Sequence, residues 1–540
     1  MTLTLAQVRT WQPGAVASIA DAVTTRRRDL LAAQDTFDAA APPSSWIGQA
    51  AAAAGAAHRQ LGAGLQDLAA ELTGVIGALD AAAEDLTTIL ADLEDALAYA
   101  RGQGCRVDLV SGMVHPDDDD APVEQVAARL GQVLQAAAQA DSTLARALRA
   151  AAATLGLTGP DAQEPAVSPP PPRGTEKDAA RWWNSLDPAA QQYVLDHHPD
   201  WIGNLDGVPG WARDEANRIL VPQYRKELSA EYDRLLDLAL RTPQSPYFFT
   251  RAGAVQKMLD GLDQIDAVLD RGGRQLLTLD ISGDHELRAA VAVGDVDTAD
   301  SVGVFVPGFT ANVRDSLAGY DSSMAALADL AATESLRQGN VQSIATVTWL
   351  GYEAPQADMG LLLPSRSVLS ASSAEAGAAD LASFLRGVEA SRDTPAHTVP
   401  IGYSYGSTVT GHALQEHTGA DAAVVLGSPG IGTDTVDDLT VPEGSTYMIE
   451  ARRDVVADTG WFGRDPSHMD GMTGLSARQE DVDGTTYTES VGHSDYLTEG
   501  STSQYNLAQI LAGQPEQAVQ HHGRGIGDWF SKPLPTPWSR

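Results

Sequence analysis

The chain has 540 residues, of which 43% are hydrophobic and 20% are charged, which is the balance of an ordinary globular protein. Its 72 acidic residues outnumber its 36 basic residues, so the formal net charge is −36. A surface this acidic repels phosphate backbones and anionic lipids, which argues against nucleic-acid binding and against a role on anionic membranes.

Cysteine content and hydropathy narrow the class of protein further. Cys105 is the only cysteine, so an intrachain disulfide and a cysteine-based metal site are both excluded. The N-terminus lacks the basic start and apolar run of a Sec-type signal peptide, and no stretch of about 18 apolar residues predicts a membrane span. We therefore expect no stable membrane insertion, and a protein that is cytoplasmic or exported without a Sec signal. A Walker loop and a dinucleotide fingerprint are absent from the sequence, so we expect no cofactor.

Residues 1–157 carry the apolar spacing of long helices. From Leu61 to Leu97 the leucines recur mostly at steps of three and four, which places them on one helical face. The prolines of Ala41-Pro42-Pro43 separate this helix from an earlier one, so we predict a helical hairpin. We predict a third helix over about 123–155, preceded by a short β-hairpin within 105–115.

The break between the first two helices contains Trp46-Ile47-Gly48. On this motif, the region resembles the WxG-type helical hairpins associated with type VII secretion in actinobacteria. The secretion signal of that class is a tyrosine followed four positions later by an acidic residue. This signal is missing here, because Tyr99 is followed by Gln103 and Tyr505 by Gln509. The resemblance implies a type VII export route, and a protein partner or self-association through the N-terminal helices.

Four further parts follow the helical region. Residues 158–177 contain four consecutive prolines and are predicted to be a semi-rigid linker. Residues 178–270 are predicted to be helical, residues 271–513 alternate strands with helices, and residues 514–540 are predicted to be a tail. Such alternation predicts an α/β domain with a mostly parallel sheet that is covered by helices on both faces. The predicted strands are 276–280, 288–293, 301–306, 343–350, 398–401, 422–426 and 446–450.

The sequence Gly402-Tyr403-Ser404-Tyr405-Gly406 lies between a predicted strand and a predicted helix. A tight Gly-x-Ser-x-Gly turn at such a junction is typical of a nucleophile elbow, in which the serine is strained and exposed. Gly402 and Gly406 leave the space that the turn requires. Ser404 is therefore the predicted nucleophile. Pro400 cannot donate to a central strand ladder, so we expect a bulge or an early strand end there.

A serine nucleophile needs a base that takes its proton and an acid that orients the base. In elbow enzymes the acid and then the histidine follow the serine along the chain. His493 lies on a loop near the end of the last strand–helix unit and is the predicted base. Asp454 follows the last predicted strand and is the predicted acid, with Asp458 as the second candidate and Asp434 as the third.

The oxyanion of an acyl-transfer intermediate needs backbone N–H donors. One is expected from Tyr405, the residue after the nucleophile, and the other from a loop after an earlier strand. Pro307-Gly308-Phe309 fits this second position, because Gly308 allows a close backbone approach and the N–H of Phe309 would donate.

Several landmarks between about residues 181 and 513 make this stretch similar to an actinobacterial family of α/β-hydrolases long catalogued only as a domain of unknown function. They are 202–209 with 213–218, Val306-Pro307-Gly308, Trp349-Leu350-Gly351-Tyr352, the elbow, Gly427-Ser428-Pro429-Gly430 and His493-Ser494-Asp495-Tyr496. The resemblance implies an α/β-hydrolase fold and a triad of Ser404, Asp454 and His493. The family's elbow commonly has a histidine where this chain has Tyr403, which alters the edge of the pocket.

The predicted function is a serine hydrolase that cleaves a small-molecule or lipid-like ester or thioester through an acyl-enzyme. Residues 351–370, with three consecutive leucines, are a candidate lining for an acyl pocket or a candidate lid. An acyltransferase would use the same acyl-enzyme and stays open. A different alternative is a non-catalytic interaction protein, or a type VII secretion-associated effector, that acts through the N-terminal helical hairpin.

Overall fold

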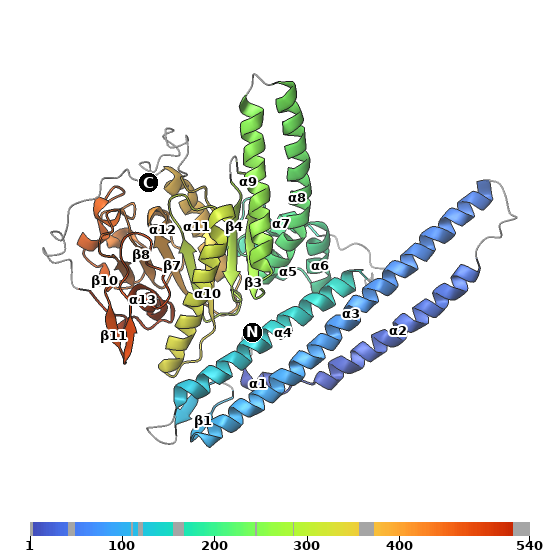
Figure 1. The fold of residues 1–540 in the computed structure, drawn as a ribbon, viewed down its shortest axis with the longest axis horizontal. Helices are drawn as coiled ribbons and strands as arrows, with labels where there is room; N and C mark the ends of the chain where they lie inside the picture. The colour runs from blue at the N-terminus through green and yellow to red at the C-terminus, as the bar shows by residue number, and fades with distance from the viewer. Residues whose placement is uncertain are drawn as a thin grey trace. The chain divides into compact units, whose positions relative to one another are not determined.

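The computed structural model describes residues 4–40, 49–109, 112–116, 122–154, 167–242, 246–283, 286–355 and 372–521 (Figure 1). These residues belong to two compact units, which are Met1–Ala166 with Gly339–Val341, and Val167–Gln338 with Gln342–Arg540. The predicted WxG motif, Trp46 to Gly48, lies outside the described residues, as do residues 356–370 of the predicted acyl-pocket loop and residues 158–166 of the predicted linker.

The N-terminal unit is built from helices, as predicted. Its elements are α1 (Leu5–Val8), α2 (Pro13–Ala39), α3 (Gln49–Gly102), β1 (Cys105–Val107), β2 (Val114–Pro116) and α4 (Val123–Thr154). The 54 residues of α3 make a helix about 80 Å long. Helices α2 and α4 both pack along α3, which buries Leu79, Leu86 and Leu93 at helical spacing. Strands β1 and β2 pair in the antiparallel hairpin that the sequence predicts.

The second unit contains an eight-stranded sheet with the strand order β10-β9-β8-β7-β5-β6-β4-β3. Its strands are β3 (Arg274–Asp280), β4 (Arg288–Val293), β5 (Ser301–Val306), β6 (Ile344–Leu350), β7 (His397–Tyr403), β8 (Ala423–Leu426), β9 (Thr446–Ile449) and β10 (Thr473–Leu475). The strands from β10 to β6 are parallel, and β4 pairs antiparallel with both β6 and β3. The predicted α/β class with a mostly parallel sheet is therefore confirmed.

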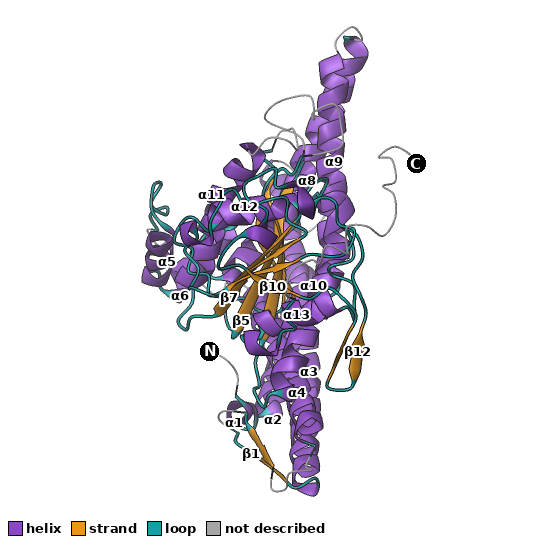
Figure 2. Ribbon diagram, turned by 90° about the vertical axis from the view of Figure 1, so that its left-hand side faces the viewer, coloured by secondary structure: helices purple, strands orange, loops and turns teal. Residues whose placement is uncertain are grey.

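Helices cover both faces of this sheet (Figure 2). They are α10 (Val313–Arg337), α11 (Ser372–Ala390), α12 (Tyr405–Ala413) and α13 (Thr502–Leu511). Alternate side chains of β5 point to opposite faces: Val302, Val304 and Val306 pack with α11 and α12, whereas Phe305 packs with α10 and α13. Burial on both faces explains why β5 is apolar throughout rather than alternating with polar residues.

The expectation of a bulge or an early strand end at Pro400 is wrong. Strand β7 lies inside the sheet and pairs with β5 in continuous register from His397 to Gly402. The N–H of Thr398 donates to the Asp421 carboxylate at 2.9 Å on the β8 side, so Pro400, two residues on, also faces β8. Registered pairing with β8 begins only at Ile401. The missing proline N–H therefore falls where that ladder starts, and the strand continues unbroken.

The segment predicted as a separate helical part, 178–270, belongs to the same compact unit as the sheet. Its helices are α5 (Glu176–Ser185), α6 (Pro188–His197), α7 (Pro199–Ile202), α8 (Gly210–Arg241) and α9 (Pro246–Leu269). The side chain of Asn204 exchanges two 2.8 Å hydrogen bonds with the backbone of Leu279, and Asn217 donates to the carbonyl of Leu276 at 2.9 Å. These bonds attach the segment to β3, while α8 and α9 pack against each other (Figure 1).

The prediction that residues 514–540 form a tail also differs from the structure at the start of this segment. The N–H of Ser476 donates to Val519 at 2.8 Å and the N–H of His521 donates to Gly474 at 2.9 Å, so the start of the tail pairs beside β10. The short strands β11 (Glu480–Val482) and β12 (Thr485–Tyr487), which the sequence analysis missed, form an antiparallel hairpin. Strands of three residues are too short to show a period in sequence.

A buried ion-pair cluster holds α10 to the edge of the sheet. Asp321 of α10 is 1% exposed and accepts hydrogen bonds from Arg271 at 2.6 Å and from Arg274 at 3.0 and 3.1 Å. Asp321→Ala removes this carboxylate from both guanidinium groups, which keep their hydrogen bonds to Ala318, Ser322 and Gly272 and remain partly exposed, and both facts reduce the loss. We expect the free energy of unfolding to fall by about 2–4 kcal/mol in urea titrations.

The matched control for this substitution is Asp263→Ala. Asp263 also pairs with an arginine, Arg225, but its side chain is 67% exposed. We expect a loss below about 1 kcal/mol for this exposed pair. Equal losses for the two variants would show that burial of Asp321 contributes nothing to the strength of its pairs.

Candidate active site

Ser404 sits at a sharp turn between β7 and α12. Its backbone has φ 54° and ψ −129°, a region that side-chain-bearing residues rarely adopt. A Cβ at Gly402 would lie 2.6 Å from the Cα of Ser407, and a Cβ at Gly406 would lie 2.1 Å from the carbonyl oxygen of Val306. Both glycines are therefore required because the backbone approaches them closely. The sequence predicts them for the same reason, which is the space that a tight turn needs.

The side chains of Ser404, His493 and Asp454 form one hydrogen-bonded chain. Nε2 of His493 lies 2.7 Å from Oγ of Ser404, and Nδ1 lies 2.9 Å from both carboxylate oxygens of Asp454. The three residues are separated by 89 and 39 positions in sequence. They meet because Ser404 follows β7 and Asp454 follows β9, at the carboxyl edge of parallel strands. The structure thus brings together the three residues that were predicted as nucleophile, base and acid.

Asp454 is fully buried, and its carboxylate accepts several hydrogen bonds. Besides His493, the donors are the N–H groups of Val456 at 3.0 Å and Ala457 at 3.3 Å, and the hydroxyl of Tyr496 at 2.5 Å. Burial alone would raise the pKa of Asp454, but these hydrogen bonds and the charge of His493 outweigh it, so the pKa is lowered. The carboxylate is therefore ionised at neutral pH and can stabilise a protonated His493.

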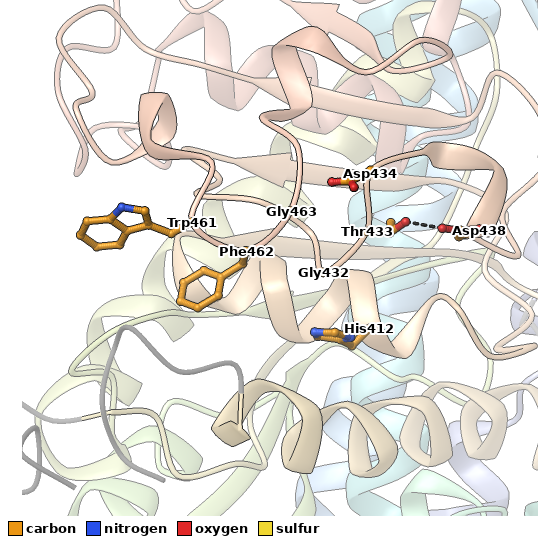
Figure 3. Close-up of a pocket in the computed structure, with 8 residues that line it drawn as sticks. All are labelled: His412, Gly432, Thr433, Asp434, Asp438, Trp461, Phe462 and Gly463. Carbon is orange, nitrogen blue, oxygen red and sulfur yellow. Dashed lines mark hydrogen bonds between the residues drawn. The ribbon is translucent and has the colours of Figure 1, made fainter. Parts of the chain in front are cut away.

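The structure does not bring Asp434, the third candidate for the acid, to the histidine. Asp434 is exposed and lines a separate pocket of about 540 Å³, together with His412, Thr433, Trp461 and their neighbours (Figure 3). Ser404, Asp454 and His493 are not among the residues that line this pocket. The pocket is therefore distinct from the hydrogen-bonded chain.

The loop after β5 lies directly against the turn at Ser404. A Cβ at Gly308 would lie 2.8 Å from the Cβ of Ser404, from the carbonyl oxygen of Tyr403 and from the backbone nitrogen of Tyr405. The neighbouring Phe309 is 39% exposed. Tyr405 begins α12, so the positive end of that helix dipole faces this region. The two segments predicted to supply oxyanion donors, at Phe309 and Tyr405, are therefore adjacent.

For the ester hydrolysis that the sequence predicts, we expect Gly308→Ala to lower kcat by about 10²–10³-fold. The added methyl group would overlap backbone atoms that cannot move aside, so the loop carrying Phe309 must shift away from Ser404. The rate would be measured with a p-nitrophenyl ester, and Gly319→Ala in α10 is the matched control because its Cβ meets nothing within 4 Å. A wild-type rate for Gly308→Ala would exclude this loop from the reacting site.

Two tyrosines contact this chain of residues in ways that the sequence did not predict. The hydroxyl of Tyr496 donates to Asp454, and the hydroxyl of Tyr403 donates to the backbone carbonyl of His493 at 2.7 Å. Both lie within motifs that were singled out, the elbow and the segment His493-Ser494-Asp495-Tyr496. Their closeness in sequence to the predicted residues was the available signal. That closeness does not show which group each hydroxyl contacts.

None of the described helices is long and apolar enough to cross a membrane. Within the same residues, no group of three or more histidine, cysteine, aspartate or glutamate side chains is arranged to hold a metal ion.

Comparison with known proteins places the chain in a family. A family model described as Alpha/beta hydrolase matches residues 282–463, which include Ser404 and Asp454. Uncharacterized protein Rv0963c of Mycobacterium tuberculosis is 34% identical over 219 residues, which are 39% of this chain and 80% of that protein. Uncharacterized protein Mb0988c of Mycobacterium bovis matches to the same extent.

A longer alignment extends the similarity beyond this region. Uncharacterized protein Rv2079 of Mycobacterium tuberculosis is 27% identical over 407 residues, which are 66% of this chain and 60% of that protein. The names of these relatives specify no activity. The chain belongs to an actinobacterial family of alpha/beta hydrolases, and this membership supports hydrolysis as its type of reaction.

Proposed function

We propose that this protein is a serine hydrolase that cleaves a carboxylic ester or thioester through an acyl-enzyme intermediate. The observation that carries the proposal is the hydrogen-bonded chain from Ser404 through His493 to Asp454, with donor–acceptor distances of 2.7 and 2.9 Å. An unassisted serine hydroxyl is a weak nucleophile, and an imidazole in hydrogen-bond contact with it supplies the missing base.

The reaction begins when Oγ of Ser404 attacks the carbonyl carbon of the substrate and its proton passes to Nε2 of His493. Asp454 keeps Nδ1 of His493 protonated and stabilises the imidazolium. The N–H groups of Phe309 and Tyr405 are the proposed donors to the oxyanion. The intermediate then expels the alcohol or thiol, which takes the proton from Nε2 of His493.

A water molecule completes the cycle. It attacks the acyl-enzyme carbonyl and gives a proton to Nε2 of His493, which returns that proton to Ser404 as the carboxylic acid leaves. If an alcohol or amine took the place of this water, the same residues would catalyse acyl transfer. Product analysis with and without an added acyl acceptor distinguishes the two.

The proposed function is tested by covalent labelling with a fluorophosphonate probe. We expect the wild-type protein to be labelled and Ser404→Ala to remain unlabelled. Ser407→Ala is the matched control. The hydroxyl of Ser407 is also buried, at the start of α12, but it donates to the backbone carbonyl of Ser404 and to the hydroxyl of Ser428. Labelling of Ser404→Ala, or an unlabelled but folded wild-type protein, would refute the proposal.

The second candidate function is an interaction protein that works through its N-terminal helices. One observation favours it: Ile19 of α2 and Leu61 of α3 are 53% and 60% exposed, so large apolar side chains of these helices are accessible to a partner. An unlabelled wild-type protein with intact folding would favour this function. A partner, self-association and type VII export remain predictions from the WxG resemblance.

A further inference from the structure

Two tyrosines hold the acid and the base from different directions. The hydroxyl of Tyr496 donates to Oδ2 of Asp454 at 2.5 Å and accepts the N–H of Ala451 at 2.9 Å. The hydroxyl of Tyr403 donates to the backbone carbonyl of His493 at 2.7 Å, and its ring centroid lies 5.2 Å from that of the imidazole. The two tyrosine rings also contact each other, with centroids 6.1 Å apart. Each hydroxyl therefore has one defined acceptor in the proposed triad.

The space around Tyr496 is fitted to the carboxylate. Gly427 follows β8 with φ +52°, and a Cβ there would lie 2.5 Å from Oδ2 of Asp454 and 3.0 Å from the hydroxyl of Tyr496. Tyr496 itself is 1% exposed. Its hydroxyl thus joins three chain segments at one point: the end of β8, the loop after β9 and the loop that carries the base.

The hydrogen bonds to Asp454 divide between its two oxygens. Oδ1 accepts the N–H groups of Val456 and Ala457, whereas Oδ2 accepts the hydroxyl of Tyr496, and His493 lies 2.9 Å from both. Burial raises the pKa of Tyr496 well above its ordinary value, so this hydroxyl keeps its proton and remains a donor. Without Tyr496, Oδ2 would accept from the imidazole alone among these donors.

We propose that Tyr496 and Tyr403 are positioning residues of the triad: Tyr496 fixes the orientation and disperses the charge of Asp454, and Tyr403 fixes the loop that presents His493. This proposal rests on the proposed function, since both tyrosines act through groups that the reaction uses. It assigns the two hydroxyls different physical effects.

The effect of Tyr496 is electrostatic as well as geometric. A hydrogen bond to a carboxylate disperses its charge, so removal of that bond strengthens the attraction of Asp454 for the imidazolium. Because the free enzyme needs a neutral imidazole as base, the acid limb of kcat/KM moves to higher pH. The bond from Tyr403 ends on a backbone carbonyl, which carries no net charge, so its removal disturbs geometry alone.

Other charged groups face this network and stay unchanged in the test. The charges of Asp454 and Asp495 interact with the hydroxyl of Tyr403, and the charges of Asp454 and Glu450 interact with the hydroxyl of Tyr496. Tyr→Phe substitutions leave all of them in place and keep both rings. A difference between the two variants in pH dependence therefore reports the hydroxyl that was removed.

The experiment compares Y496F and Y403F in the full chain, with p-nitrophenyl acetate as substrate. For Y496F we expect kcat to fall about 10–100-fold and the acid limb of kcat/KM to rise by about 0.5–1 pH unit. For Y403F we expect kcat to fall about 3–10-fold without a shift of the limb. KM should change less than about threefold in both, since neither hydroxyl is assigned to substrate binding.

The matched control is Y505F. Tyr505 is also buried and donates to a backbone carbonyl, that of Gln517 at 3.3 Å, but it contacts none of the three triad residues in the hydrogen bonds described. We expect its kcat and pH profile to equal those of the wild type. Thermal unfolding of each variant then separates a loss of stability from a loss of rate.

Three results would overturn the proposal. The first is a Y496F protein with a lower Tm but wild-type kcat and an unmoved acid limb, which would make Tyr496 an ordinary core residue. The second is an equal shift of the limb in Y403F and Y496F, which would remove the assigned difference. The third is a wild-type protein that neither cleaves the ester nor reacts with a fluorophosphonate. That result refutes the proposed function, and the inference with it, whereas the first two leave the proposed function standing.

Discussion

Replacing Ser404 by alanine should lower kcat/KM for a p-nitrophenyl ester by a factor of about 10⁴–10⁶. The substitution removes the only atom that the proposed mechanism uses to form the acyl-enzyme, and it leaves Nε2 of His493 without the hydroxyl that it contacts at 2.7 Å. Alanine is no better suited than serine to φ 54°, so we expect the free energy of unfolding to change by less than about 1 kcal/mol. The loss should therefore appear in rate and not in folding.

A double variant makes this expectation sharper. His493→Ala should lose nearly as much activity as Ser404→Ala, and the combination should lose no more than either alone, because the two side chains act as one unit. Ser407→Ala, which removes a neighbouring buried hydroxyl, should lose less than about tenfold. A Ser404→Ala protein that retains more than about a hundredth of the wild-type rate would show that another nucleophile carries the reaction.

The nucleophile region was predictable because its constraints are local. A turn this tight needs glycines at fixed offsets from the serine, and the overlaps of 2.6 Å and 2.1 Å that a Cβ would make at Gly402 and Gly406 show why. The acid could be proposed from its place after the last predicted strand, and the base from its loop near the end of the last strand–helix unit, in the chain order that elbow enzymes show. The elbow is contained in five consecutive residues, and the order of acid and base can be followed along the chain, so both signals are available without knowledge of the fold.

The rest could not be read in the same way because it depends on contacts between distant segments. The bond from Tyr496 to Asp454 joins residues 42 positions apart, and no period or motif encodes it. Pro400 misled the strand prediction because its effect depends on which neighbour its nitrogen faces, and that is settled by pairing with β8. The helical segment before the sheet was predicted as a separate part, yet the buried side chain of Asn217 hydrogen-bonds it to β3.

The same sheet explains why the candidate site assembles at all. Strands β5, β7 and β9 are parallel, so their carboxyl ends lie along one edge. The first is followed by Gly308, the second by Ser404 and the third by Asp454. Short strands suffice for this purpose, since β8 and β9 have only four residues each. The loops need no long reach, and this favours a rigid arrangement of the reacting groups.

Asp454→Asn should lower kcat by a factor of about 10³–10⁴ while leaving KM nearly unchanged. The carboxylate accepts from Nδ1 of His493, which fixes the tautomer whose Nε2 can take a proton from Ser404. An asparagine can turn its amide N–H toward Nδ1 instead, and the imidazole then carries its proton on Nε2, where it cannot act as a base. An asparagine also lacks the charge that stabilises the imidazolium.

The same substitution has a signature in stability against pH. The pKa of Asp454 is lowered in the folded protein from its ordinary value near 3.8, so in the window between the two values the unfolded chain binds more protons. The stabilisation from this carboxylate is therefore present above about pH 4 and lost as pH falls through the folded pKa. Thermal unfolding from pH 7 downward should show this loss in the wild type and a flatter dependence in Asp454→Asn.

Asp434→Asn and Asp458→Asn are the controls that decide which carboxylate orients the base. Both residues were alternatives in sequence, but Asp454 already occupies the position 2.9 Å from Nδ1 of His493. One imidazole N–H has room for one such partner, so we expect both control variants to keep kcat within about threefold of the wild type. If instead Asp458→Asn were as slow as Asp454→Asn is expected to be, and Asp454→Asn were fast, the acid would have to be reassigned. The contact between His493 and Asp454 would then be an ordinary buried ion pair rather than part of a proton-transfer chain.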